Sequence, residues 1–167
     1  MIDRLAAGKV AATHGLHGEL RVRSLSGGVE HLVVLTEAAF RKDGVETVLR
    51  LASARAAHPD ILMKVSGIDT PEKARQLVGA EIWVPRSQAS PLASGEYYVA
   101  DLCQCGLYWK EELIGKVRSV VEAGGAQLLE VATAQGATRL VPFTHHFIAE
   151  VEVEKGRIFL REDEIVR

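Results

Sequence analysis

Short runs in which apolar and polar residues alternate recur along the chain and predict β-strands joined by tight turns. Residues 20–25 show the pattern clearly, because Arg21 and Arg23 alternate with apolar residues and are expected to face solvent. Asp43-Gly44 lies between two such runs and is a strong signal for a two-residue hairpin turn. The pattern therefore predicts many short strands rather than a bundle of helices.

One short helix is predicted in the first half of the chain. Thr70 can cap its start, Pro71 suits its first position and Gly79 suits its end. A strand is expected directly afterwards, at residues 81–85. Several strands and one helix in about 85 residues predict a small β-barrel, although a sandwich would produce a similar pattern.

A small, polar, proline-containing stretch divides the chain into two predicted domains. We place the first domain at residues 1–86, the linker at 87–95 and the second domain at 96–167. In the second domain, residues 113–121 predict a long strand and Lys155-Gly156 predicts the turn of a hairpin. The second domain is therefore also expected to be all-β.

Composition and charge narrow the class of protein. Of the 167 residues, 47% are hydrophobic and 25% are charged, which is typical of a folded chain. No apolar run approaches the roughly 18 residues of a membrane helix, and no signal-peptide core is present, so a cytoplasmic protein is expected. Residues 1–88 carry 12 Lys and Arg against 10 Asp and Glu, whereas residues 89–167 carry 8 against 12. An acidic second half suits a basic protein partner better than bare RNA.

Two adjacent tyrosines, Tyr97 and Tyr98, follow the predicted linker. Adjacent side chains on a strand point to opposite faces, so one ring can pack inward while the other stays outside. Tyrosine is enriched at the energetic centres of protein interfaces, which makes the pair a candidate anchor. The alternative is an ordinary strand start whose second ring lies over the neighbouring domain.

Two groups of residues invite a catalytic or metal-binding interpretation. Cys103, Cys105, His145 and His146 carry the ligand types of zinc, but their spacing is poor for a zinc site, so no metal site is predicted and their roles stay open. A zinc-dependent enzyme remains the third functional alternative.

The loop that holds His14 and His17 offers imidazoles without a recognisable nucleophile motif or phosphate-binding loop. Gly15 and Gly18 bracket a tight connection, and Glu19 is expected to order it. We therefore expect no enzymatic activity and no cofactor. Scattered basic strand residues could contact phosphate or form a solvated face: Arg21, Arg23, Arg41, Lys42 and Lys64.

Several motifs carry a family resemblance. Residues 8–22 resemble the N-terminal signature of the RimM family of bacterial ribosome maturation factors. Residues 95–102 with 113–117 resemble the start of the PRC-barrel domain of that family, and residues 140–143 and 151–158 resemble its closing motifs. The motifs occur in the family order along nearly the whole chain.

The resemblance implies a mainly all-β fold of two barrels, a translation-factor-like barrel with one short helix followed by a PRC-barrel. It implies no catalysis, but assistance in assembling the head of the 30S subunit and in processing 16S rRNA. It also implies binding of a basic small-subunit ribosomal protein, for which the matching or neighbouring residues are Tyr97, Tyr98, Glu96 and Asp101. We expect the protein to be a monomer that binds 16S rRNA in the pre-30S particle, and we expect no membrane partner.

Contacts with RNA or the ribosome are expected from the N-terminal loop and the strand after it, at His14, Gly15, His17, Gly18, Glu19, Arg21 and Arg23. The chain departs from the family pattern at Val99-Ala100, where an aromatic-His pair is frequent, and at His17, where Arg or Lys is common. The functional alternative from another class is a PRC-barrel docking module in membrane-associated electron transport.

Overall fold

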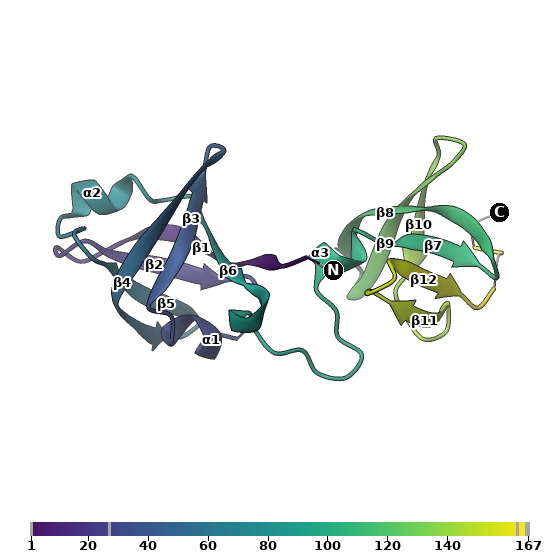
Figure 1. The fold of residues 1–167 in the computed structure, drawn as a ribbon, viewed down its shortest axis with the longest axis horizontal. Coiled ribbons are helices and arrows are strands. Elements are labelled where there is room, and N and C mark those ends of the chain that lie inside the picture. The colour runs from purple at the N-terminus through teal and green to yellow at the C-terminus, as the bar shows by residue number, and fades with distance from the viewer. Residues whose placement is uncertain (1, 27, 163, 166–167) are drawn as a thin grey trace. The chain divides into compact units, whose positions relative to one another are not determined.

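The computed structural model describes residues 2–26, 28–162 and 164–165, which form two compact units (Figure 1). The first unit comprises Asp3–Pro91, and the second begins at Leu92 and includes Ile2. This division falls inside the predicted linker, whose bounds of 87–95 stay a prediction. Within the described residues, no helix has both the length and the apolar character needed to span a membrane.

The first unit is a closed barrel of six antiparallel strands. The order around the barrel is β1-β2-β5-β4-β3-β6. Closure pairs each of these six strands on both sides, so none of the described strands of this unit is an open sheet edge. The strands are β1 (Arg4–His14), β2 (Glu19–Ser24), β3 (Glu37–Lys42), β4 (Val45–Ala57), β5 (Asp60–Val65) and β6 (Glu81–Pro85).

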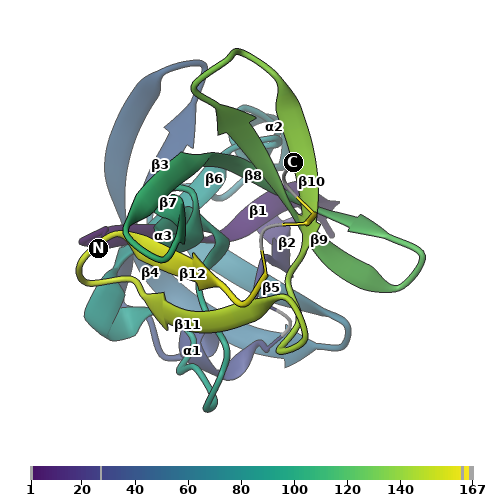
Figure 2. The same cartoon turned by 90° about the vertical axis from the view of Figure 1, so that its right-hand side faces the viewer.

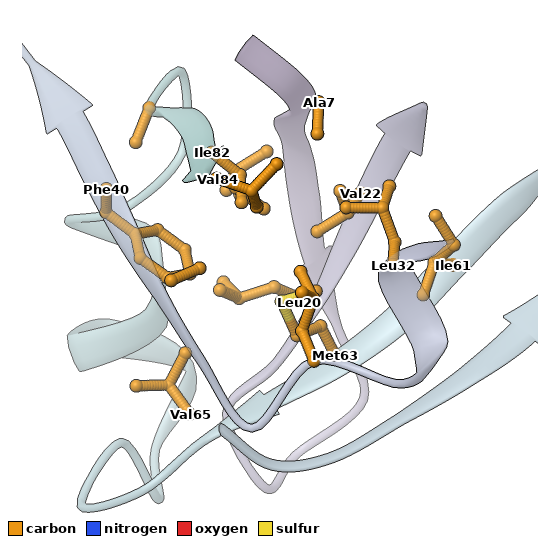
Figure 3. Packing of buried hydrophobic residues seen from close by; sticks show 14 of the residues in the cluster. Ala7, Leu20, Val22, Leu32, Phe40, Ile61, Met63, Val65, Ile82 and Val84 are labelled. Atoms are coloured by element: carbon orange, nitrogen blue, oxygen red, sulfur yellow. The ribbon is translucent and has the colours of Figure 1, made fainter. Parts of the chain in front are cut away.

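The interior of the barrel is filled by the inward-facing residues of its strands. Leu20 and Val22 of β2 are buried with Ile61 and Met63 of β5, and all four point into the same cluster (Figure 3). Arg21 and Arg23, which alternate with Leu20 and Val22 on β2, face outward and are exposed. This confirms the alternation predicted for residues 20–25. The barrel core therefore fixes which side of β2 is presented to solvent.

Local sequence signals account for the turn and the helix of this unit. Asp43 and Gly44 both have positive φ, at 51° and 79°, as the predicted two-residue hairpin between β3 and β4 requires. Helix α2 (Pro71–Arg75) starts after Thr70, whose Oγ1 accepts a hydrogen bond from the Lys73 amide at 3.4 Å.

Two further helical segments were not predicted, and both are single turns: α1 (Glu30–Val33) and the 3₁₀ turn η1 (Arg86–Gln88). The sequence around α1 is an apolar run without a cap signal, and the helix has no side-chain cap. A segment of four residues is too short to show helical periodicity, so the sequence could not separate it from a strand.

The second unit is a six-stranded sheet of order β10-β9-β8-β7-β12-β11 (Figure 2). All neighbours are antiparallel except β12 and β7, which are parallel. Its strands are β7 (Gly106–Trp109), β8 (Glu112–Ala123), β9 (Ala126–Thr133), β10 (Thr138–Pro142), β11 (Ile148–Glu152) and β12 (Arg157–Leu160), and the short helix α3 spans Val99–Leu102. The mainly all-β prediction is confirmed for both units, including the hairpin at Lys155-Gly156.

Gly115 lies beside an irregularity in the pairing of β7 and β8. The register between β7 and β8 shifts beside it, and a Cβ at this position would lie only 2.9 Å from the carbonyl carbon of Ala132 on β9. Real Cβ atoms do not approach backbone this closely, so the strands can pack at this point only around a glycine.

Candidate functional site

The tyrosine pair does not lie on a strand, which corrects the sequence-based expectation. Tyr98 is the residue before helix α3, and its carbonyl accepts hydrogen bonds from the amides of Asp101 and Leu102 at 3.0 and 3.1 Å. Local propensity favours a strand at this aromatic and β-branched segment, but the turn of helix buries Leu102 in the core of the second unit. Burial therefore overrides the local preference.

The two tyrosine rings have different surroundings. Both residues are half-buried. The ring of Tyr97 packs edge-on against Phe143, with ring centroids 5.9 Å apart and planes at 75°, and it lies against the core cluster of the second unit. Tyr98 is not part of that cluster. Tyr97 therefore contributes to the core of the second unit, whereas Tyr98 lies outside that cluster.

The two neighbouring acidic residues also differ. Glu96 is exposed, and its carboxylate accepts a hydrogen bond from the Ala93 amide at 2.9 Å. Asp101 is only 1% exposed, and its Oδ1 accepts from the amide of Ile2 at 3.0 Å. This burial corrects the expectation that the Asp101 carboxylate faces a partner, because a buried carboxylate holding a backbone amide serves the fold.

The cysteines and the histidine pair take part in hydrogen bonds and ring contacts within the second unit. Burial raises the pKa of the thiols of Cys103 and Cys105, so both stay protonated near neutral pH, and the Cys105 thiol donates to the carbonyl of Asp101 at 3.3 Å. The carbonyl of His145 accepts a hydrogen bond, and the ring of His146 packs on Phe147 at 4.7 Å. Among the residues that the structure describes, no group of three or more His, Cys, Asp and Glu side chains could hold a metal ion.

The N-terminal loop between β1 and β2 is held by its glycines. Gly15 and Gly18 have φ of 63° and 74°, in the left-handed region that favours glycine. Gly18 is buried, and a Cβ there would lie 3.0 Å from both the carbonyl carbon of Ile68 and the amide nitrogen of Thr70, and closer still to the Ile68 oxygen. The loop and α2 lie at the same end of the barrel (Figure 1).

The side chain of Lys64 on β5 holds this loop by hydrogen bonds. Its ammonium donates to the carbonyls of His17 and Ile68 and to the carboxylate of Asp69, the last at 2.9 Å. The side chain is only 19% exposed. A role of Lys64 in contacting phosphate is therefore wrong for this structure, because its donors are engaged inside the protein.

The hydrogen bond from Lys64, reinforced by its charge, lowers the pKa of Asp69 below its ordinary value of 3.8. The stabilisation from this pair is therefore complete above that ordinary value and is lost as the pH falls through the lowered pKa.

The remaining predicted residues lie on or beside this loop. His14 ends β1 opposite Glu19, and His17 is exposed in the turn. Both carboxylate oxygens of Glu19 accept hydrogen bonds from Nη2 of Arg55 on β4, at 2.9 and 3.1 Å, which ties the loop to a third strand. The sequence carries no signal for this partner, because it lies 36 residues away.

The guanidinium groups of the β2 arginines are exposed to solvent and only partly paired with acidic groups. Both Arg21 and Arg23 are exposed, and both approach the carboxylate of Asp60, at 4.0 and 3.9 Å. One carboxylate at such distances compensates two guanidinium groups only in part. The loop and the β2 arginines thus belong to the first unit, whereas the tyrosine pair belongs to the second.

Replacing Lys64 by methionine is expected to loosen the loop, because two carbonyls then lose a charged donor while the apolar stem is kept. We expect the first unit to lose about 1–2 kcal/mol of unfolding free energy and the amides of the loop to exchange faster with solvent. Hydrogen exchange and urea unfolding measure both. Lys42→Met is the matched control, since that ammonium donates to a single exposed carbonyl at 2.9 Å. Unchanged exchange at His17 and Gly18 in Lys64→Met would contradict the role.

Comparison with known proteins places the chain in a family. Residues 5–89 match the family model of the RimM N-terminal domain, and residues 99–165 match that of the RimM PRC barrel domain. A ribosome maturation factor RimM of Treponema pallidum is 40% identical over 164 residues, covering 91% of this chain and 94% of the relative. That of Treponema denticola is 37% identical over 172 residues, covering 95% and 96%.

A crystal structure of the 16S ribosomal RNA processing protein RimM from Pseudomonas aeruginosa is 26% identical in sequence. The match covers 96% of this chain and 98% of that chain, with a TM-score of 0.48.

The alternative of an electron-transport docking module gains no support, because the family matches cover both units and not only the PRC barrel. On the two domain matches and the identity to curated relatives, the chain belongs to the RimM family.

Proposed function

We propose that this chain, a member of a family of ribosome maturation factors, assists assembly of the 30S head and processing of 16S rRNA by binding. The observation that carries the proposed mode of action is the tyrosine pair beside the exposed Glu96. Two half-buried rings next to a carboxylate combine apolar contact area with attraction for a cationic surface. The proposed partner is accordingly a basic small-subunit ribosomal protein.

The charge of the second half of the chain supports the choice of a basic partner. Residues 89–167 carry 12 acidic against 8 basic side chains. Complementary charge raises the rate of encounter more than it raises affinity, so the acidic surface would guide the partner while the rings hold it. Asp101 contributes to this site indirectly in our proposal, by stabilising the segment that follows Tyr98.

The first unit is proposed to contact the RNA of the immature subunit. Its candidate residues are those of the N-terminal loop and β2: His14, Gly15, His17, Gly18, Glu19, Arg21 and Arg23. The exposed β2 arginines can approach phosphates, while the glycines and Glu19 keep the loop in shape. Together the two units would hold a ribosomal protein and nearby RNA in one geometry.

A holding function of this kind needs neither a catalytic group nor a cofactor, and we propose that the protein has neither. The thiols of Cys103 and Cys105 fit this proposal, because burial keeps them protonated rather than nucleophilic. We further propose that the protein acts as a monomer in the cytoplasm, where ribosomal subunits are assembled.

The test is the ribosome profile of a strain that lacks this protein. We expect free small subunits with unprocessed 16S rRNA ends to accumulate, and the wild-type gene to restore the normal profile. As a control, loss of the protein should leave free large subunits with mature RNA. A normal profile with mature 16S rRNA in the deletion strain would contradict the proposed function.

A further inference from the structure

The tip of the N-terminal loop carries an unusual apolar side chain. Leu16, between Gly15 and His17, is 79% exposed, more than any other large hydrophobic residue of the described chain. Single exposed leucines are common on protein surfaces and need no function. This one differs because the backbone that presents it is fixed.

The two residues that follow Leu16 in the loop are held by other parts of the first unit. The carbonyl of His17 accepts a hydrogen bond from Lys64, and Gly18 is packed against the backbone of residues 68–70. The exposure of Leu16 is therefore a property of the folded loop and not of a frayed end. A side chain presented in advance on a fixed backbone loses less conformational entropy when it binds.

Four cations on strands β1, β2 and β4 form a basic face on the first unit: Lys9, Arg21, Arg23 and Arg55. Cross-strand partners point to the same side of a sheet. The register pairs Lys9 with Arg23, and it pairs both Arg21 and Arg55 with Leu62 of β5, so the four cations share the outer side of β1, β2, β5 and β4.

The acidic groups near the basic face compensate only part of its charge. Glu19 pairs with Arg55 at 2.9 Å, and Asp60 stands about equally far from Arg21 and Arg23. Glu81 of β6 is the cross-strand partner of Lys9 and adds a third carboxylate to this side. Four cations thus stand against three carboxylates. A surface of this charge fits a phosphate backbone, whereas an apolar protein pocket would gain nothing from it.

We propose that Leu16 is an apolar wedge that inserts between exposed bases of ribosomal RNA while the basic face holds the adjoining phosphates. Leucine wedges of this kind exploit partly unstacked bases, which an immature and irregular RNA offers without the full cost of unstacking. The wedge gives a position of contact, and the cations give the surrounding electrostatic attraction. This inference rests on the proposed function, since it specifies how the first unit contacts the RNA.

The first test is the affinity of the full-length protein for immature small subunits purified from cells that lack it, at constant salt. Leu16→Ser is expected to weaken binding about tenfold without changing the melting temperature, because the side chain makes no core contact. Val34→Ser is the matched control, since Val34 is 74% exposed but lies outside the loop, and it should change affinity by less than about twofold.

The outcomes separate the two proposals. If the wild-type protein binds these particles and Leu16→Ser binds equally well, the wedge is overturned while the proposed function stands. If the wild-type protein does not bind them at all, the proposed function itself fails.

A second measurement identifies the occupant. A photoreactive diazirine amino acid placed at position 16 of the full-length protein is irradiated in the complex with immature small subunits. We expect a crosslink that ribonuclease removes and that maps to an unpaired or irregular segment of 16S rRNA. A crosslink to a ribosomal protein, which protease and not ribonuclease removes, would overturn RNA as the occupant.

Discussion

Replacing Gly18 by alanine is expected to lower the unfolding free energy of the first unit by about 3 kcal/mol, the sum of a backbone penalty and a steric one. The backbone penalty arises because φ is 74°, which a residue with a Cβ adopts at a cost of about 1–2 kcal/mol. The steric penalty arises because the new Cβ would meet the carbonyl of Ile68 and the amide of Thr70. Both are backbone atoms, so relieving the clash must displace the segment that Lys64 also holds.

Gly15→Ala separates the two contributions. Gly15 has a similar φ of 63°, but a Cβ there would meet no atom within 4 Å, so only the backbone penalty of about 1–2 kcal/mol is expected. Each unit contains one tryptophan, Trp83 in the first and Trp109 in the second. Urea unfolding followed by the fluorescence of Trp83, in a Trp109→Phe background, therefore reports the first unit alone. Equal losses in the two variants would show that the contact with residues 68–70 contributes nothing.

Features that depend on neighbours in the chain could be predicted from the sequence. Asp43-Gly44 predicts its turn because both residues tolerate the positive φ that the hairpin needs. Thr70 and Pro71 predict the start of α2 because capping involves residues only three positions apart. The alternation around Arg21 and Arg23 predicted the exposed side of β2 for the same reason, since it reflects the pleat of a single strand.

The environment of a residue could not be predicted where its contacts come from distant parts of the chain. Lys64 reads as a surface cation, but its ammonium meets a carbonyl 47 residues away. Asp101 reads as an acidic group at a binding site, but the fold buries it against the amide of Ile2, 99 residues away. Contacts at such separations arise from the topology of the fold, and no local pattern encodes them. The exposure of Leu16 has the same origin, since an apolar residue in a turn gives no local sign of whether the fold will cover it.

For the tyrosine pair, the residue types could be interpreted from the sequence, but the local backbone structure could not. Two adjacent tyrosines indicated an anchor, and the expectation that their rings differ in burial followed from a strand that the structure replaces with the start of α3. The rings still differ in their surroundings, because Tyr97 packs on Phe143 and Tyr98 lies outside the core cluster. Single replacements can therefore separate stability from binding at this site.

Tyr98→Ala is expected to weaken the binding of immature small subunits by about 30-fold, or about 2 kcal/mol, as loss of an aromatic anchor does at an interface. The melting temperature of this variant is measured as well, so that its affinity is compared with that of the wild-type protein where both are fully folded. Tyr97→Ala is expected to lower the unfolding free energy of that unit by about 2 kcal/mol, because it removes a ring that packs edge-on against Phe143 and contacts the core. Unfolding followed by Trp109 in a Trp83→Phe background measures this loss.

Two further variants make the binding result specific to the anchor. Tyr98→Phe keeps the ring and removes the hydroxyl, so it should retain most of the affinity if the apolar face carries the contact. Tyr108→Ala removes a tyrosine that packs on Phe159 at 5.7 Å elsewhere in the same unit, and it should reduce stability without the 30-fold loss of binding. If Tyr98→Ala and Tyr97→Ala both bind the particles as tightly as the wild-type protein does, the pair is not an anchor. The second unit would then have to engage its partner through another surface.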